Sequence, residues 1–187
     1  MAEKTPVRRT DALRNRERVL QAAREAFTEL GSEASMIEII RRSGVGSATV
    51  YRNFASRRDL LEAILVEEIN DVCAAAATVT ADTAQARLTA WLRRFSDYVT
   101  SKRPVAIELL EHVERTDPVF ETGRERVLVA GAPLLAAAQE AGEVSAAISL
   151  EQILDLIVAI AKIPCDPTYR EPILEMALAG LHPSARH

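Results

Sequence analysis

The side chains best suited to chemistry gather in one short stretch, RRSGVGSATVYRNF, at residues 41–54. Arg52 can reach a phosphate or form two hydrogen bonds with guanine, and Asn53 can pair with adenine. Thr49 offers a methyl and a hydroxyl group to thymine, while Tyr51 can donate its hydroxyl to a phosphate. These side chains together are suited to contacting double-stranded DNA.

Two short helices and a glycine-containing turn are predicted to position these groups. A capping box, Ser35 to Glu38, opens the first helix, and Gly44 ends it. The second helix is expected over residues 47–54, where Val50 and Phe54 share one face that packs on neighbouring helices. The polar side chains then face away, which is the layout of a helix-turn-helix that lies in a major groove about 12 Å wide.

Charge is distributed unevenly along the 187 residues. Residues 1–58 contain 12 Lys/Arg and 7 Asp/Glu, a net of +5, and residues 59–187 contain 11 and 20, a net of -9. This asymmetry suggests a polyanionic partner for the basic part of the chain. A second interpretation stays open, because exposed basic helix faces and helix-turn-helix geometry also occur in proteins that bind no DNA.

The rest of the pattern predicts an all-α chain. An apolar stripe with helical spacing indicates a first helix over residues 11–30, and another capping pattern starts a connecting helix over residues 57–76. No segment alternates long enough to be a strand. We therefore expect a basic N-terminal arm at 1–10, a three-helix DNA-binding domain at 11–58 with its motif at 35–54, and a helical bundle at 59–187.

Composition narrows the class of protein further. Hydrophobic residues make up 48% and charged residues 27%, which is typical of a soluble globular chain. No apolar run approaches the roughly 20 residues of a membrane span, and no secretory signal is visible, so we expect a cytoplasmic protein with no membrane partner. Cys73 and Cys165 are the only cysteines, which argues against a zinc site; they are read as unpaired thiols, with a redox pair as the alternative.

The stretch GVGSATVYRNFASRRDLLEAIL resembles the N-terminal domain of TetR-family transcriptional regulators. The resemblance covers about residues 14–68, with Gly46 and Ile40 as departures from the usual pattern. It implies an all-α regulator, with a helix-turn-helix head joined to a bundle that binds a small-molecule effector and forms a homodimer on a palindromic operator, usually as a repressor. The predicted DNA-contacting residues are Arg41, Arg42, Ser47, Ala48, Thr49, Tyr51, Arg52, Asn53 and Arg57.

The second half of the chain supplies candidates for the dimer interface and the effector pocket. Apolar stripes near the C-terminus predict the interface residues Ile153, Leu156, Ile157, Ile160, Ile173, Ala177, Leu178 and Leu181. The same stripes would also suit the core of a monomer. Central segments predict the pocket residues Trp91, Phe95, Tyr98, Glu108, His112 and Phe120, each of which could equally be plain packing.

Two other classes of function stay open at this level. An enzyme would need a catalytic motif, but the sequence has no Rossmann glycine fingerprint, P-loop or H-E-x-x-H, and no cofactor is expected. A purely structural helical dimer would need no DNA contact. The exposure of Thr49, Tyr51 and Asn53 is the observation that separates these interpretations.

Overall fold

A computed structural model gives the structure of the chain and describes residues 5–101 and 118–182. Within these ranges the chain forms α-helices and one short 3-10 helix, with no strand, which confirms the predicted all-α fold. None of the described helices combines the length and the apolar character that a membrane span needs. The chain divides into two compact units, and the boundary falls between Glu67 and Glu68 rather than after residue 58 as predicted.

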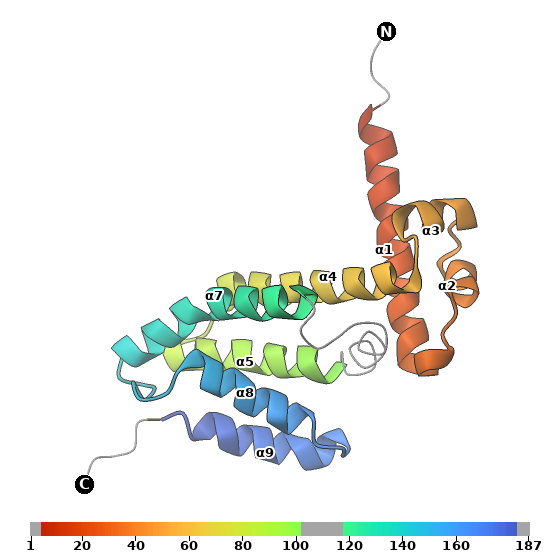
Figure 1. Cartoon of the computed structure of the whole chain (residues 1–187). Coiled ribbons are helices and arrows are strands. Elements are labelled where there is room, and N and C mark those ends of the chain that lie inside the picture. Colours follow the sequence, from red (N-terminus) through yellow and green to blue (C-terminus); the bar gives the residue numbers. More distant parts are fainter. Residues whose placement is uncertain (1–4, 102–117, 183–187) are drawn as a thin grey trace. The chain divides into compact units, whose positions relative to one another are not determined.

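Unit 1 contains α1 (Thr5–Leu30), the 3-10 turn Gly31–Glu33, α2 (Met36–Ser43), α3 (Ser47–Asn53) and the first turns of α4 (Arg57–Thr78). Helix α1 packs against both α2 and α3 (Figure 1). Its core is apolar and nearly fully buried, with Leu20, Phe27, Ile39, Val50 and Phe54 at most 1% exposed. Three helices around one such core make the predicted head.

Helix α1 starts earlier than the sequence pattern suggested. It begins at Thr5, so the predicted arm over residues 1–10 is wrong for residues 5–10. The only proline there, Pro6, lies in the first turn of the helix. Backbone N–H groups in the first turn make no hydrogen bond within the helix, so proline removes none, and its fixed φ is compatible with helical geometry. The polar residues after it carry no helix-breaking signal.

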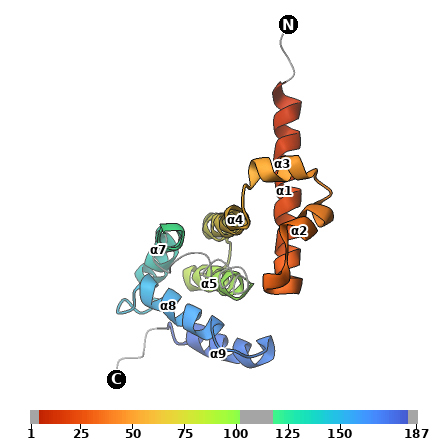
Figure 2. The same ribbon diagram turned by 45° about the vertical axis from the view of Figure 1, so that its right-hand side comes forward.

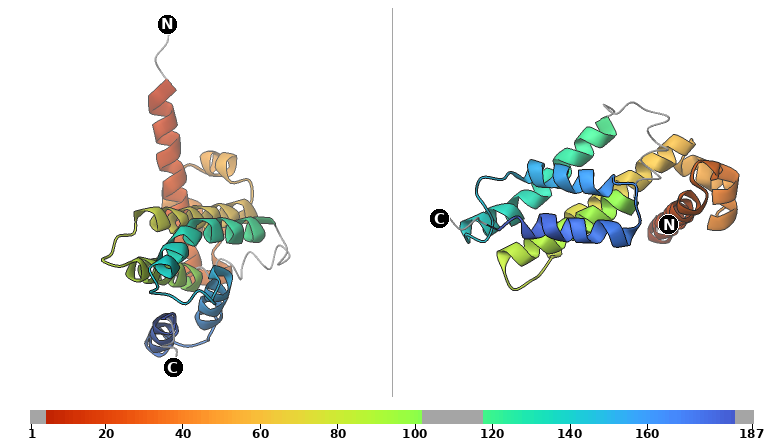
Figure 3. Two further views of the ribbon diagram at one scale, coloured as in Figure 1. Left: turned by 90° about the vertical axis from the view of Figure 1, so that its left-hand side faces the viewer. Right: turned by 90° about the horizontal axis from the view of Figure 1, so that it is seen from below.

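Unit 2 contains the remaining turns of α4 together with α5 (Ala84–Ser101), α7 (Pro118–Glu140), α8 (Leu150–Ala161) and α9 (Pro167–Ala179). Helix α5 packs against α7 and α8, and α8 packs against α7 and α9 (Figures 2 and 3). Ser149 and Gln152 form a reciprocal capping box at the start of α8, and the Asp166 carboxylate accepts from the Tyr169 amide at the start of α9. These caps define where α8 and α9 begin.

Two glycines of α7 bring its backbone close to its neighbours. A Cβ atom at Gly123 would collide with the Ile69 side chain of α4, and one at Gly131 would collide with the Trp91 ring of α5. The Trp91 indole is fully buried, and its Nε1 donates a 3.0 Å hydrogen bond to the Val72 carbonyl. Unit 2 is therefore built around a large aromatic side chain for which α7 supplies the space.

Burial corrects much of the predicted dimer interface. Five of its residues pack inside unit 2 with exposures of 1 to 4%: Ile153, Ile157, Ile160, Leu178 and Leu181. Their side chains offer almost no surface to a second copy, so the prediction is wrong for them. Ile173 and Ala177 are half-buried, and Leu156 is 45% exposed. The apolar stripes of α8 and α9 mostly cover the core of their own unit.

Candidate nucleic-acid interface

The turn between α2 and α3 is fixed by short side chains and one left-handed glycine. Gly44 ends α2 with φ = 61°, a conformation that glycine adopts without a Cβ clash. The buried Ser43 hydroxyl donates to the Ile40 carbonyl at 3.0 Å and accepts from the Val45 amide at 3.2 Å. These contacts satisfy backbone groups in the turn and set where α3 begins.

Helix α3 is held to unit 1 by two buried side chains. Val50 and Phe54 are 0% and 1% exposed, as their four-residue spacing predicted. The Arg16 guanidinium of α1 lies 4.8 Å from the centre of the Phe54 ring, and Arg16 also lies 3.9 Å from the Glu67 carboxylate. Arg16 thus secures the end of α3 through a cation–π contact with Phe54.

The opposite side of α3 faces solvent, and we call it the contact face. It consists of Ser47, Ala48, Tyr51, Arg52 and Asn53, all exposed, with Tyr51 47% exposed. Thr49 is half-buried beside them. The predicted separation of an apolar anchor from a polar outer surface is therefore present in this helix.

Side chains of the contact face bond to their own helix. Arg52 donates from Nη2 to the Thr49 hydroxyl at 2.9 Å and from Nε to the Ala48 carbonyl at 3.1 Å. Asn53 donates from Nδ2 to the Thr49 carbonyl at 2.8 Å. The carbonyls already accept helix hydrogen bonds, so these side chains can exchange them for phosphate or base-edge partners without leaving a buried group unsatisfied.

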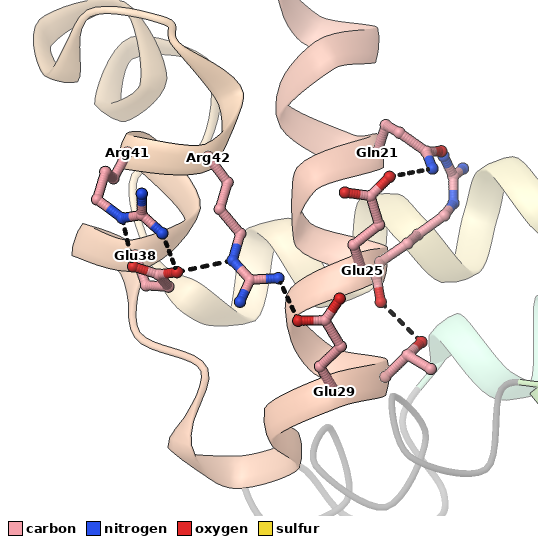
Figure 4. Close-up of polar contacts among 8 residues, drawn as sticks. Gln21, Glu25, Glu29, Glu38, Arg41 and Arg42 are labelled. Carbon is pink, nitrogen blue, oxygen red and sulfur yellow. Dashed lines mark hydrogen bonds and ion pairs between the residues drawn. The ribbon is translucent and has the colours of Figure 1, made fainter.

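The arginines of α2 are held by acidic neighbours (Figure 4). Arg41 makes two bonds to the Glu38 carboxylate, at 2.7 and 2.8 Å, while its side chain stays 70% exposed. Arg42 lies between Glu38 and Glu29, at 2.7 Å from each, and is 21% exposed. Hydrogen bonds from Arg41 and Arg42 lower the pKa of Glu38 to about 2. Arg41 is thus more accessible to a phosphate than Arg42.

The Glu38 contacts also correct one detail of the predicted capping box. The Ser35 hydroxyl accepts from the Glu38 amide at 3.2 Å, as expected for the N-cap of α2. The reciprocal bond from the Ser35 amide to the Glu38 carboxylate is not formed, because that carboxylate binds Arg41 and Arg42. Glu38 and Glu29 were missed as members of this region, although Glu38 is three and four residues from the two arginines, a spacing that favours ion pairs.

Arg57 was also a predicted phosphate ligand, at the start of α4. Its side chain is half-buried, with its guanidinium 4.9 Å from the centre of the Phe27 ring and Nη1 donating to the Ala34 carbonyl. The amide of Ser56 donates to the Asp59 carboxylate. This carboxylate places a negative charge at the start of α4, where a phosphate would be repelled. The structure therefore favours a packing role for Arg57 over the predicted phosphate contact.

Both units match family models. Residues 19–64 match the model described as bacterial regulatory proteins, tetR family, and residues 82–183 match the one described as Transcriptional regulator SbtR-like, C-terminal domain. The second match alone covers more than half of the 187 residues. This chain belongs to the TetR family. Membership confirms the predicted class, a DNA-binding transcriptional regulator with a helix-turn-helix head followed by a helical domain.

Solved structures and a curated relative agree with the TetR assignment. TetR transcriptional regulator SCO0520 from Streptomyces coelicolor is 32% identical, with a TM-score of 0.76 over 91% of this chain and 99% of that chain. The TetR regulatory protein from Mycobacterium vanbaalenii is 28% identical, with a TM-score of 0.76 over 94% and 99%. The HTH-type transcriptional regulator SAB2452 of Staphylococcus aureus is 36% identical over 63 residues. The chain spans about a third of the length of that curated relative, 34%.

In this TetR-family chain, the predicted effector-pocket residues fall into two groups. Glu108, His112 and the side chain of Phe120 lie outside the described residues. Trp91 is fully buried, Phe95 is 6% exposed and stacks on it at 6.3 Å between ring centres, and Tyr98 is half-buried. Burial, and secondarily the nearby Cys73, raises the pKa of Tyr98. These contacts favour the packing interpretation for Trp91 and Phe95.

Proposed function

We propose that this protein is a ligand-responsive repressor that acts in the cytoplasm as a homodimer on a palindromic operator, with no catalytic role. The observation that supports it most directly is the contact face of α3. Tyr51, Arg52 and Asn53 are exposed there, while Val50 and Phe54 anchor the helix from behind. A short helix with one buried apolar face and one exposed polar face suits insertion into a major groove.

The proposed contacts follow from the chemistry of each side chain. Arg52 binds guanine or a phosphate, Asn53 reads adenine, and Tyr51 donates its hydroxyl to a phosphate. Thr49, Ser47 and Ala48 present small or hydroxylic groups that allow the helix backbone to approach the duplex. Arg41, with its exposed guanidinium, adds a phosphate contact beside the groove.

The homodimer is proposed because one α3 buries too little surface for tight, specific binding. Two copies placed about 34 Å apart would read two half-sites one helical turn apart on the same side of the duplex. The second unit leaves exposed apolar side chains on its last two helices, with Leu156 45% exposed on α8, and Tyr169 63% and Met176 70% exposed on α9. We assign the dimer interface to this exposed side of α8 and α9, in place of the buried residues first predicted.

The effector is proposed to act through the geometry of that dimer. A small molecule that binds one arrangement of the second unit better than another shifts the population towards it. If that arrangement changes the spacing of the two heads, both copies of α3 no longer fit successive grooves, and the operator is released. An operator affinity that no small molecule alters would remove this part of the proposal and leave DNA binding in place.

The DNA-binding part is tested by a mobility-shift assay with the DNA upstream of the protein's own coding sequence. The expected result is a retarded band that weakens steeply with salt, because counterions return to the duplex when phosphate contacts break. The Tyr51→Ala/Arg52→Ala variant should lose the shift and keep its helical circular dichroism. Arg87→Ala removes the same charge from an exposed site of the second unit and serves as the matched control. An unchanged shift in the double variant would refute the role of α3.

The dimer is tested by sedimentation of variants at equally exposed apolar positions. Met176 on α9 and Val129 on α7 are both 70% exposed, so aspartate at either site meets water in a monomer. Met176→Asp should shift the protein towards monomers, whereas Val129→Asp should stay dimeric. A dimer in both variants would move the interface away from α9.

A further inference from the structure

A cavity with a volume of about 330 Å³ lies between α5 and α9 inside unit 2. This volume falls at the lower end of the roughly 300–1,000 Å³ typical of small-molecule sites. The residues that matter for its chemistry are Ser96, Asp97 and Thr100 of α5, and Arg170, Glu171 and Leu174 of α9. None of the DNA-contact or dimer candidates lines it.

Ser96 is the first indication that the cavity takes a polar ligand. Its side chain is only 4% exposed, yet its hydroxyl has no hydrogen-bond partner among the described residues. Serine in a helix can bond back to the carbonyl four residues earlier, and here it does not. The Ser96 hydroxyl is not among the fully buried polar atoms that lack a partner, so it is open to the cavity, where a polar group of a ligand can bond to it.

Arg170 gives a second, independent indication from the other helix. Its Nη2 donates to the Ile163 and Cys165 carbonyls at 3.2 and 2.9 Å, which fixes the guanidinium at the start of α9. Its Nε–H is buried and finds no acceptor in the part of the chain that the structure describes. A guanidinium held in place by two backbone carbonyls therefore lines the same cavity as Ser96.

The charges around the cavity limit what can bind. Glu171 is already paired with Arg93, whose Nη1 lies 3.1 Å from its carboxylate. Asp97 is exposed at the rim and has no ion pair within the described residues. The cavity thus offers one available carboxylate, from Asp97, and one guanidinium, from Arg170. The hydroxyls of Ser96 and Thr100 on α5 add uncharged hydrogen-bonding groups.

The cavity is separate from the aromatic side of α5. Ser96 and Thr100 are four residues apart and share one face of the helix. Trp91 and Phe95 share a different face, because the Trp91 ring lies against Gly131 of α7 and bonds to α4. A ligand between α5 and α9 would therefore leave the aromatic core in place.

We propose that this cavity binds a small zwitterion of the free amino acid class. The ligand's carboxylate is held by Arg170, its ammonium group by Asp97, and Ser96 and Thr100 complete the hydrogen bonds, with Leu174 against its apolar part. Binding itself is independent of DNA. Its regulatory consequence rests on the proposed function, since α9 also carries Met176 of the proposed dimer interface.

Isothermal titration calorimetry of the full chain without DNA tests the proposal. The probes are the common free amino acids, with acetate, ethylamine and glucose as comparison compounds that carry only part of the chemistry. At least one amino acid should bind saturably with a Kd of about 1 mM or tighter, and the comparison compounds should bind more weakly. Asp97→Asn and Ser96→Ala should each weaken that binding by about tenfold or more, because each removes a group that contacts the ligand.

Asp71→Asn makes the same chemical change at an exposed position of α4 and should leave the affinity unchanged. Absence of binding by every amino acid, equal binding of acetate or glucose, or an unaltered Kd in Asp97→Asn would each overturn the proposal. Since no DNA is present, these outcomes are independent of the mobility-shift result, and a protein that fails to bind DNA could still bind the amino acid.

Discussion

Helix α3 and helix α8 were both predicted to present a face to another molecule, but in the structure only the predicted face of α3 is exposed. On α3 only Val50 is buried, and the polar side stays exposed. On α8 most of the apolar stripe, including Ile153, Ile157 and Ile160, is buried within the same unit. A polar face on a short helix can only meet solvent or a partner, whereas an apolar face can be satisfied by the core of its own unit or by a second copy.

The strongest way to test this difference is to place a charge on the buried side of α8. Ile160 is 4% exposed, so Ile160→Asp puts a carboxylate into the core and should lower the free energy of unfolding by about 4 kcal/mol or more. Trp91 is the only tryptophan and is fully buried in unit 2, so its fluorescence during urea denaturation reports the unfolding of this unit.

Val129→Asp is the matched control, because Val129 lies in the same unit and is 70% exposed. It should change the free energy of unfolding by no more than about 0.5 kcal/mol. If Ile160→Asp kept wild-type stability and only abolished dimers, Ile160 would be a surface residue and the original interface prediction would be restored.

Glycine substitutions sharpen the comparison, because the two units use glycine for different purposes. Gly131→Ala inserts a methyl group against the fully buried Trp91 ring and should destabilise unit 2 by about 1–3 kcal/mol, with a shift in Trp91 fluorescence. Gly46→Ala, at the start of α3, meets no atom within 4 Å and should cost only about 0.5–1 kcal/mol as a poorer N-cap. Equal effects in urea denaturation would contradict the packing role of Gly131.

The head could be predicted closely from its sequence because local signals specify it. Ser35, Gly44, Val50 and Phe54 perform the capping and anchoring roles that their types and spacing indicated. The residues that a long side chain contacts were harder to predict. Arg57 packs on Phe27 of α1, thirty residues earlier in the chain, and no local pattern encodes such a contact.

Unit 2 could be predicted only as helices, for a related physical reason. The apolar pattern fixes which side of α8 avoids water but not which neighbour covers it. The cavity between α5 and α9 depends on residues more than sixty positions apart, such as Ser96 and Arg170, that no spacing rule connects. Trp91 was expected in a pocket, and the glycine opposite it, Gly131, is what allows it to be core instead.

The arginines of α2 allow a smaller, electrostatic test within the head. Glu38→Gln removes a negative charge and releases Arg41 from its ion pair, while Arg42 keeps its pair with Glu29. Both changes favour a polyanion, so operator affinity at low salt should rise by roughly two- to fivefold, with a steeper salt dependence. Fluorescence anisotropy with labelled operator DNA measures the change.

Glu25→Gln is the control for that test, since it alters the same charge on α1 at a residue that contacts Gln21. Its effect should be smaller than that of Glu38→Gln. A loss of affinity in Glu38→Gln would show instead that Glu38 is needed to orient Arg41 towards a phosphate, which reverses the inferred role of this carboxylate.

The smallest expected effect is the titration of Glu38 itself. Hydrogen bonds from Arg41 and then Arg42 lower its pKa from 4.5 to about 2, so these ion pairs stabilise the folded head above pH 4.5 and lose that contribution as the pH falls towards 2. NMR of the side-chain carboxyl carbon should find Glu38 still ionised at about pH 3.5, where an ordinary glutamate is largely protonated. In Arg41→Gln/Arg42→Gln the midpoint should return towards 4.5. A midpoint near 4.5 in the unaltered protein would mean that the arginines are released in solution and already available to DNA.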